Sequence, residues 1–171
     1  MEIDFLQAPC KESSTKPVFG LCDDPPPAKN KAYISEDGHK KNTWIAQVLN
    51  KDEKSIHFYA IDHCIEISKP NEPKKEESRC DGLLVTESFY KFIELKDCKL
   101  SDRNWRKKGN QQLKTTISIF RENYPEIPTT TISAQLCNKK HSSSNILYQD
   151  SQDEFFQETG IILEIKRQIT L

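Results

Sequence analysis

The chain has 171 residues, enough for one domain with a sizeable buried core. Hydrophobic residues make up 35% and cluster in short runs, which excludes a disordered chain. The formal net charge of -1 excludes a strongly basic nucleic-acid-binding protein. Between Lys91 and Lys114, however, eight cations stand against three acids, which predicts a locally positive surface.

The chain contains no recognisable targeting or membrane-spanning segment. Residues 1–10 include Glu2 and Asp4 and lack a long apolar core, and no run approaches the ~20 apolar residues of a membrane span. We therefore expect a cytoplasmic protein with no membrane partner. The six cysteines include no pair with C-x2-C spacing. In a reducing cytosol we expect free, mostly buried thiols, with a metal site or a disulfide as the alternatives.

Residues 1–42 are rich in turn-forming residues and include Asp23-Asp24-Pro25-Pro26-Pro27, which fits neither a helix interior nor a central strand. We interpret 1–42 as an extended N-terminal arm packed on the domain, and 43–171 as the domain itself. A partly disordered leader is the alternative for this segment.

From residue 43 onward, alternating and continuous apolar runs predict regular elements. In chain order we first expect a hairpin of strands 44–49 and 56–67, a loop over 68–79 and a second hairpin of strands 80–86 and 90–95. A charged connection over 97–108 then leads to a helix over 110–124 and a strand over 129–136. A short helix ending at Gly160 and a strand over 161–170 complete the chain. The predicted fold class is α+β, with a mixed β-sheet flanked by helices.

The second hairpin carries the chemically informative residues. Side chains alternate between the two faces of a strand, so Glu94 and Lys96 point the same way, while Ile93 and Leu95 point into the opposite layer. Asp81 stands thirteen residues before Glu94. A hairpin with its turn at 87–89 brings the start of one strand beside the end of the other. Two carboxylates and one amine then converge.

This set of groups suits hydrolysis of a phosphodiester bond. Carboxylate oxygens of Asp81 and Glu94, with the backbone carbonyl of Leu95, are suitable ligands for Mg²⁺ or Mn²⁺. The amine of Lys96 can orient the attacking water and stabilise its anionic form. The alternative is a solvated hairpin edge with an ordinary Glu–Lys ion pair, because Glu-x-Lys is common in charged proteins.

Three other positions are candidates for the site. Gln112, on the polar face of the predicted helix, can hydrogen-bond a metal-bound water or a phosphate, or simply face solvent. The basic residues of 139–141 can bind phosphate, or only end a buried strand. Asp62 is a further acid near the site, and a Cys64–His63 nucleophile is a remote alternative.

At these residues the sequence resembles the PD-(D/E)XK nuclease superfamily. Asp81 looks like its strand aspartate, Glu94-Leu95-Lys96 looks like its (D/E)xK element, and Gln112 looks like the glutamine on the following helix. The resemblance implies a restriction-endonuclease-like core and metal-dependent cleavage of nucleic acid. Many members also carry a glutamate on a helix before the aspartate strand. No residue fills that role cleanly here, and the candidates are Asp62, Glu53 and Glu12.

A second resemblance extends over most of the chain and is to small standalone bacterial proteins of uncharacterised function. The segments that carry it are 19–23, 44–46, 60–64, 79–82, 92–98 and 137–141. It implies the same core and specifies no substrate.

The sequence thus predicts a Mg²⁺- or Mn²⁺-dependent nuclease of DNA processing or defence, with Asp81, Glu94, Lys96 and Gln112 as catalytic residues. Among nucleic-acid partners DNA is favoured over RNA, and a homodimer or a protein partner stays open. The alternative function is a catalytically weak or inactive nuclease-like module that binds nucleic acid or a partner protein.

Overall fold

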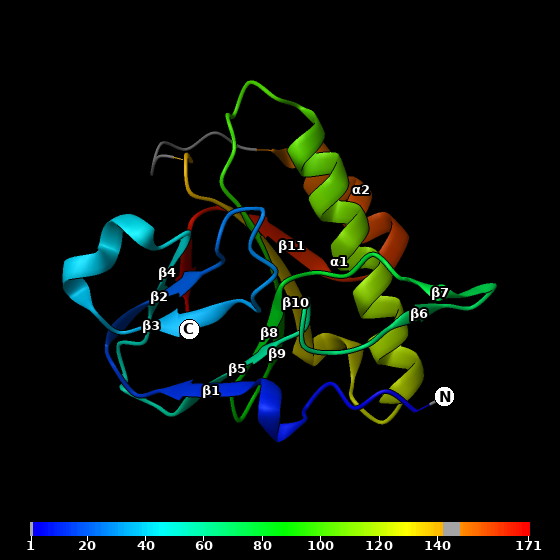
Figure 1. Ribbon diagram of the computed structural model, residues 1–171. Coiled ribbons are helices and arrows are strands. Elements are labelled where there is room, and N and C mark those ends of the chain that lie inside the picture. The colour runs from blue at the N-terminus through cyan, green and yellow to red at the C-terminus, as the bar shows by residue number, and fades with distance from the viewer. Residues whose placement is uncertain (1, 142–147) are drawn as a thin grey trace.

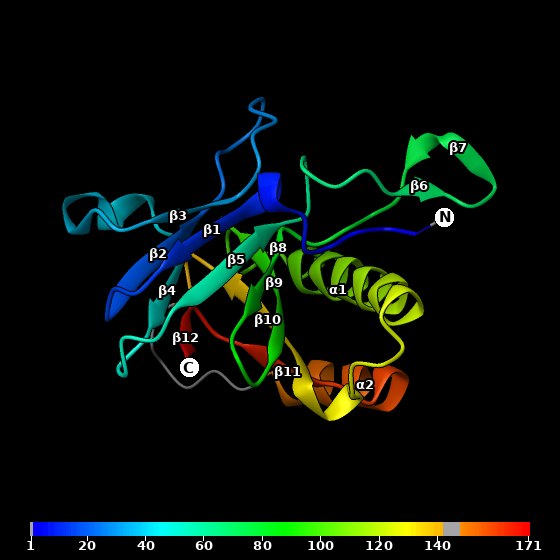
Figure 2. The ribbon, with the colours of Figure 1, turned by 90° about the horizontal axis from the view of Figure 1, so that it is seen from below.

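The structure is a computed structural model that describes residues 2–141 and 148–171. Two helices, a six-stranded sheet and a four-stranded sheet form three successive layers, with the six-stranded sheet in the middle (Figures 1 and 2). The α+β class with a mixed sheet is confirmed. Within the described part of the chain, neither helix combines the length and the apolar character needed to cross a bilayer.

The central sheet has the strand order β1-β5-β8-β9-β10-β11. Its strands are β1 (Lys11–Ser14), β5 (Ile56–Ala60), β8 (Gly82–Val85), β9 (Tyr90–Lys96), β10 (Ile132–Asn138) and β11 (Ile162–Ile165). The pairs from β1 to β9 are antiparallel, whereas β9–β10 and β10–β11 are parallel. Each parallel connection passes through a helix: α1 (Asn104–Asn123) precedes β10 and α2 (Gln149–Thr159) precedes β11.

The smaller sheet has the order β12-β4-β2-β3. Its strands are β2 (Val18–Cys22), β3 (Tyr33–Ser35), β4 (Ala46–Leu49) and β12 (Gln168–Thr170). Residues 1–42 therefore supply β1 to the central sheet and β2 and β3 to the smaller one. Short 3-10 helices at Ala8–Cys10 (η1), Gly38–Thr43 (η2) and Thr129–Thr131 (η3) connect these elements.

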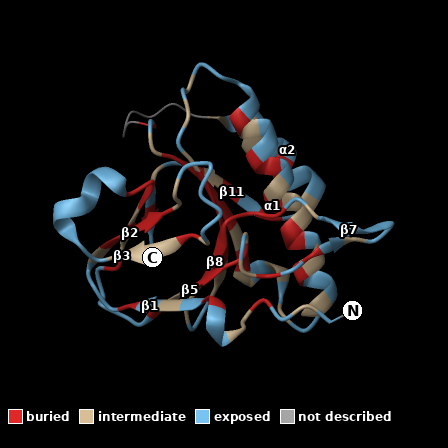
Figure 3. Ribbon diagram, viewed as in Figure 1, coloured by how far each residue is buried: buried red, intermediate tan, exposed pale blue. Residues whose placement is uncertain are grey.

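Each face of the central sheet buries its own core, so its four inner strands, β5, β8, β9 and β10, are buried almost continuously (Figure 3). Toward the helices, Leu83 and Phe92 pack with residues of α1 such as Leu113, Ile117 and Phe120. Toward the smaller sheet, the core is formed by apolar side chains from both sheets: Phe19, Leu21, Ala46, Val48, Ile56, Phe58, Ala60, Leu84, Ile93, Leu95, Cys137 and Ile169.

The hairpin predicted over 44–67 is wrong. β4 pairs with β2 and β12 in the smaller sheet, whereas β5 pairs with β1 and β8 in the central sheet. The apolar residues of the two strands therefore meet across the core between the sheets rather than side by side in one sheet. β5 also ends at Ala60, because residues 61–64 turn, with His63 at a φ of 59°.

The remaining elements differ mainly at their ends. The second predicted hairpin is confirmed as β8 and β9. The loop predicted over 68–79 contains a small hairpin of β6 (Ser68–Lys69) and β7 (Glu72–Glu76). α1 begins six residues before residue 110, because Trp105 is buried against the core and Asp102 accepts a hydrogen bond from the N–H of Asn104.

The strand predicted over 161–170 is divided between the two sheets. β11 extends the central sheet, and β12 pairs with β4 after the chain crosses at residues 166–167. Buried Gln135 holds this crossing, since its amide donates to the carbonyls of Lys166 and Gln168. Buried Lys91 contacts Gln135 and forms an ion pair with Glu164, with 3.0 Å between Nζ and Oε1.

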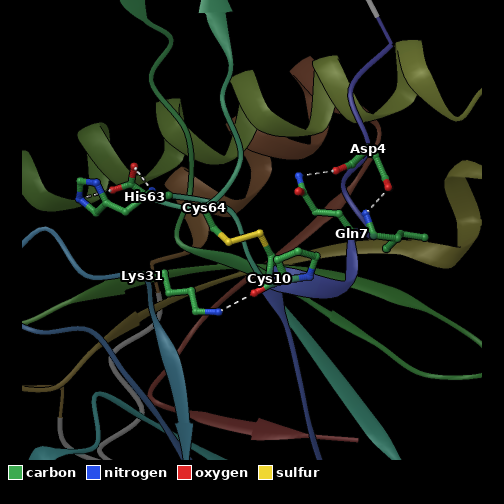
Figure 4. Close-up of a disulfide and its surroundings, with 9 residues drawn as sticks. Asp4, Gln7, Cys10, Lys31, His63 and Cys64 are labelled. Carbon is green, nitrogen blue, oxygen red and sulfur yellow. Dashed lines mark hydrogen bonds and ion pairs between the residues drawn. A yellow bond between two sulfur atoms is a disulfide. The ribbon is translucent and has the colours of Figure 1, made fainter.

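Cys10 and Cys64 form a disulfide, with their Cα atoms 5.9 Å apart (Figure 4). The expectation of free thiols is therefore wrong for these two residues and holds for Cys22, Cys80, Cys98 and Cys137. The bond also removes Cys64 as a nucleophile. A disulfide is typical of an oxidising compartment, so it counts against the reducing surroundings on which the free-thiol expectation depended.

We expect Glu164→Gln to lower the free energy of unfolding by about 2 kcal/mol at neutral pH, because it removes the charged partner of buried Lys91. Burial raises the pKa of Glu164, but hydrogen bonds and charge from Lys166 and Lys91 outweigh burial and lower it below 4.5. The stability from this carboxylate is therefore present above its ordinary pKa and is lost as the pH falls through the lowered value. Urea unfolding at several pH values should show that the difference in unfolding free energy between the wild type and Glu164→Gln becomes smaller in acid. Glu154→Gln, on the exposed surface of α2, should not change stability measurably.

Replacing both Cys10 and Cys64 by serine should cost about 4 kcal/mol of stability, because the bond closes a loop of 54 residues in the unfolded chain. A dithiol reductant should lower the unfolding midpoint of the wild type to that of the double variant and leave the variant unchanged. A wild-type midpoint that does not respond to reductant would contradict this expectation.

Candidate functional site

The candidate site lies where β8 begins and β9 ends, on the face of the central sheet that α1 covers. The antiparallel register pairs Gly82 with Ile93, so the preceding residue, Asp81, lies beside Glu94. Alternation along β9 directs Glu94 and Lys96 to the same face as buried Phe92. Asp81, Glu94 and Lys96 therefore lie together at one end of this hairpin, as the sequence predicted.

Asp81 is only 7% exposed, and its carboxylate is fixed by the backbone of the neighbouring strand. Oδ2 accepts a hydrogen bond of 2.6 Å from the N–H of Leu95. Burial raises the pKa of Asp81 well above 3.8, and the negative charges of Glu94 and Asp23 raise it further. The folded protein therefore resists ionisation of this carboxyl group when no cation is present.

Glu94 and Lys96 form a buried ion pair that continues into α1. Glu94 is 1% exposed and its Oε1 accepts from Lys96 Nζ, which also donates to Gln112 Oε1 at 2.8 Å. Gln112 in turn donates through Nε2 to the carbonyl of Arg79, at 3.0 Å. This chain fixes the amine of Lys96 between the strand and the helix. Gln112, predicted to belong to the site, thus contacts Lys96 directly.

The protonation of this pair follows from burial and charge. Burial raises the pKa of Glu94 to about 7, although the neighbouring ammonium of Lys96 opposes the rise. Burial lowers the pKa of Lys96, but the carboxylate of Glu94 outweighs burial and raises it. Lys96 is therefore held in its cationic form beside a carboxylate that gains or loses its proton near neutral pH.

Close packing of α1 on β9 depends on Gly109. A Cβ atom at this position would lie 2.6 Å from Leu136 Cδ1 and 3.4 Å from Glu94 Cγ. Any side chain here would push the helix away from the sheet. Two turns further along α1, Thr116 Oγ1 accepts a hydrogen bond from the N–H of Cys80, which fixes the backbone just before Asp81.

Two further acids lie near the site. Asp62 pairs with the buried guanidinium of Arg79, with 3.0 Å between Oδ1 and Nε, and its charge helps to raise the pKa of Glu94. Asp23, directly after β2, has its pKa raised by burial and by the charge of Asp62. Asp23 was not among the site residues predicted from the sequence, although its place immediately after a buried strand was a usable signal.

The other two upstream candidates lie elsewhere. Glu12 accepts a hydrogen bond from the N–H of Ile34 and so joins β1 to β3, and Glu53 is exposed in the turn after β4. Of the three upstream acids proposed from the sequence, only Asp62 is near Asp81 and Glu94.

The basic residues that follow β10 differ in their exposure. Lys139 and Lys140 lie 3.7 and 3.6 Å from the carboxylate oxygens of Asp97 and remain partly exposed. His141 is buried, its ring lies 5.7 Å from that of Tyr148, and burial lowers its pKa. The two lysines rather than the histidine are therefore available to an anion.

The buried carboxylates provide a direct test of fit for a divalent ion. Within residues 2–141 and 148–171, no group of three or more His, Cys, Asp or Glu side chains is placed to hold a metal as the side chains stand. Glu94 Oε2, however, is buried and has no hydrogen-bond partner among the described residues. A buried carboxylate oxygen without a donor is costly, and a bound cation is one partner that would satisfy it. The donors present, carboxylate and carbonyl oxygens, fit Mg²⁺ or Mn²⁺.

Comparisons with protein-family models, with curated proteins and with solved structures each gave no match.

We expect Asp81→Asn to stabilise the ion-free protein by about 1–2 kcal/mol at neutral pH, because folding of the wild type must either bury this carboxylate or protonate it, whereas the amide avoids both costs and its oxygen still accepts from Leu95. Since the pKa of Asp81 is raised on folding, the wild type binds a proton more tightly when folded and gains stability as the pH falls toward 3.8. The advantage of the variant should therefore shrink in acid. Denaturant unfolding with a chelator, across a pH series, measures both effects. Asp52→Asn, in an exposed turn, serves as the control.

Proposed function

We propose that this protein is a divalent-metal-dependent nuclease that hydrolyses phosphodiester bonds, with DNA as the favoured substrate. The observation that carries the proposal is the buried pair of carboxylates, Asp81 and Glu94, with the ammonium of Lys96 beside them and one Glu94 oxygen that no described residue hydrogen-bonds. A purely structural ion pair would need only one carboxylate beside Lys96. The positive charge of Lys96 compensates one negative charge, so it does not compensate the second buried carboxylate as well.

The order of elements around the site supports a restriction-endonuclease-like core. Three antiparallel strands, β5, β8 and β9, are followed by α1 and by β10, which runs parallel to β9. Asp81 stands at the start of the second strand, Glu94 and Lys96 at the end of the third, and Gln112 on the helix. This is the arrangement that the resemblance to the PD-(D/E)XK superfamily implies.

Asp81, Glu94 and the carbonyl of Leu95 would hold Mg²⁺ or Mn²⁺. When bound, such an ion supplies positive charge that polarises the phosphate and lowers the pKa of the attacking water. Glu94 and Asp81 balance the charge of the ion. Their raised pKa values predict that proton release accompanies its binding.

Lys96 is suited to act on the attacking water. A cation bound by the Glu94 carboxylate would compete with Lys96 for that carboxylate. Gln112 would still keep the amine of Lys96 in place, because Gln112 Oε1 accepts a hydrogen bond from Nζ independently of Glu94. The amine can then donate a hydrogen bond to the water and stabilise the hydroxide-like nucleophile as the phosphorane forms. Gln112 is thus a positioning residue for Lys96.

Saturating Mn²⁺ should raise the free energy of unfolding of the wild type by about 2–3 kcal/mol, because the ion binds the folded state alone. Asp81→Asn should lose this gain. Lys96→Gln should retain it, but should lower the rate of DNA cleavage by about a hundredfold or more. Thermal unfolding and cleavage of a labelled duplex measure the two effects.

Lys99→Gln, an exposed lysine beyond β9, controls for the loss of one positive charge. Cleavage that continues undiminished in Lys96→Gln would refute the mechanism. A wild type that Mn²⁺ does not stabilise would favour the alternative, a module that binds nucleic acid or a protein without cleaving.

A further inference from the structure

A second charged feature lies on the smaller sheet, away from the two carboxylates. Residues of η2, β4, the end of β10 and the β11–β12 crossing enclose a pocket of about 450 Å³. Figures 1 and 2 show these segments converging beside the C-terminal ends of the central strands. The size lies within the range of sites that bind small molecules or nucleotide units.

The described residues that line this pocket include four cations and no acid: Lys41, Lys139, Lys140 and Arg167. Asp97, outside the lining, lies within 4 Å of Lys139 and Lys140 and offsets part of their charge. The cations come from three parts of the chain that are distant in sequence, so the fold itself has gathered them. Like charges around one cavity repel, and an anion inside it would relieve that repulsion.

One of these cations, Arg167, is held in place by the protein backbone. Arg167 donates from Nε to the carbonyl of Ile45 at 3.2 Å and from a terminal nitrogen to that of Trp44 at 2.9 Å. Lys41 Nζ lies 5.8 Å from the centre of the Trp44 ring. Trp44 is only 2% exposed, so its ring cannot stack on a base. The pocket therefore suits contact with phosphate rather than with bases.

Lys139 connects the pocket to the candidate site. Its backbone N–H donates to the carbonyl of Lys96 at 2.8 Å, so the segment after β10 that carries Lys139 and Lys140 lies beside the end of β9 that carries the site.

We propose that this pocket, formed by Lys41, Lys139, Lys140 and Arg167, binds a backbone phosphate of the nucleic-acid strand beyond the bond that is cleaved. The inference depends on the proposed function and extends it, because it assigns the smaller sheet to substrate binding. Contacts to phosphate alone make this part of the binding independent of base sequence.

The test is equilibrium binding of a short fluorescent DNA duplex in the presence of a chelator, so that cleavage plays no part. Lys41→Glu combined with Lys140→Glu should raise Kd by about tenfold or more and reduce the slope of log Kd against log salt by about 1, because one phosphate contact is lost. Both lysines are exposed, so the fold should persist, which thermal unfolding checks. A second duplex of unrelated sequence should show the same loss.

A matched control, Lys51→Glu with Lys74→Glu, makes the same change in net charge at exposed sites outside the pocket and should bind like the wild type. The proposal is overturned if the pocket variant and the control bind equally, with equal salt slopes. It is also overturned if inorganic phosphate protects the protein from unfolding through these lysines while the duplex binds both variants alike. That result would assign the pocket to a small anion.

The two proposals fail in different ways. If the wild type cleaves DNA with Mn²⁺ and the pocket variant binds and cleaves like the control, the pocket assignment fails and the nuclease stands. If no cleavage occurs but the pocket variant loses binding, the nuclease fails and the pocket remains a phosphate-binding site.

Discussion

The pairing of β8 with β9 is the constraint on which the rest of the site depends. This register sets Asp81 beside Glu94 and offers the N–H of Leu95 to the Asp81 carboxylate. A slip of one residue would turn Glu94 and Lys96 toward the smaller sheet and bury Ile93 and Leu95 under α1. Because both faces of β9 are buried, such a slip would place two charged side chains in the apolar core between the sheets. The hydrophobic pattern of the strand therefore also enforces the position of the charged groups.

Sequence patterns predicted the parts of this structure that local geometry determines. Alternation in β9 and the spacing of apolar residues along α1 gave the buried faces, and the short turn at 87–89 gave the hairpin. The pairing of β4 and β5 with strands of different sheets was not predictable in this way. A period of two residues identifies the apolar face of a strand but not its neighbour, and both strands present such a face to the same core.

The same reasoning explains which site residues the sequence revealed. Asp81, Glu94 and Lys96 lie on two consecutive strands, so one hairpin brings them together. Gln112 required only the following helix to pack on that hairpin. Asp23 reaches the site from β2 in the other sheet, and the disulfide of Cys10 with Cys64 joins segments 54 residues apart. Contacts of this kind depend on how the layers stack, which no local pattern encodes.

The buried carboxylates of the site reduce the stability of the fold, and this cost indicates a functional role. Burial raises the pKa of both Asp81 and Glu94, while Lys96 can compensate one negative charge. The chain also accepts a glycine within α1, at a cost in helix propensity of about 1 kcal/mol, so that the helix can lie against Leu136 and Glu94. A leucine or methionine in place of Asp81 and Glu94 would avoid the cost of burying the two carboxylates. Selection for stability alone would favour those residues, and the cation proposed for this site would offset the cost of the carboxylates.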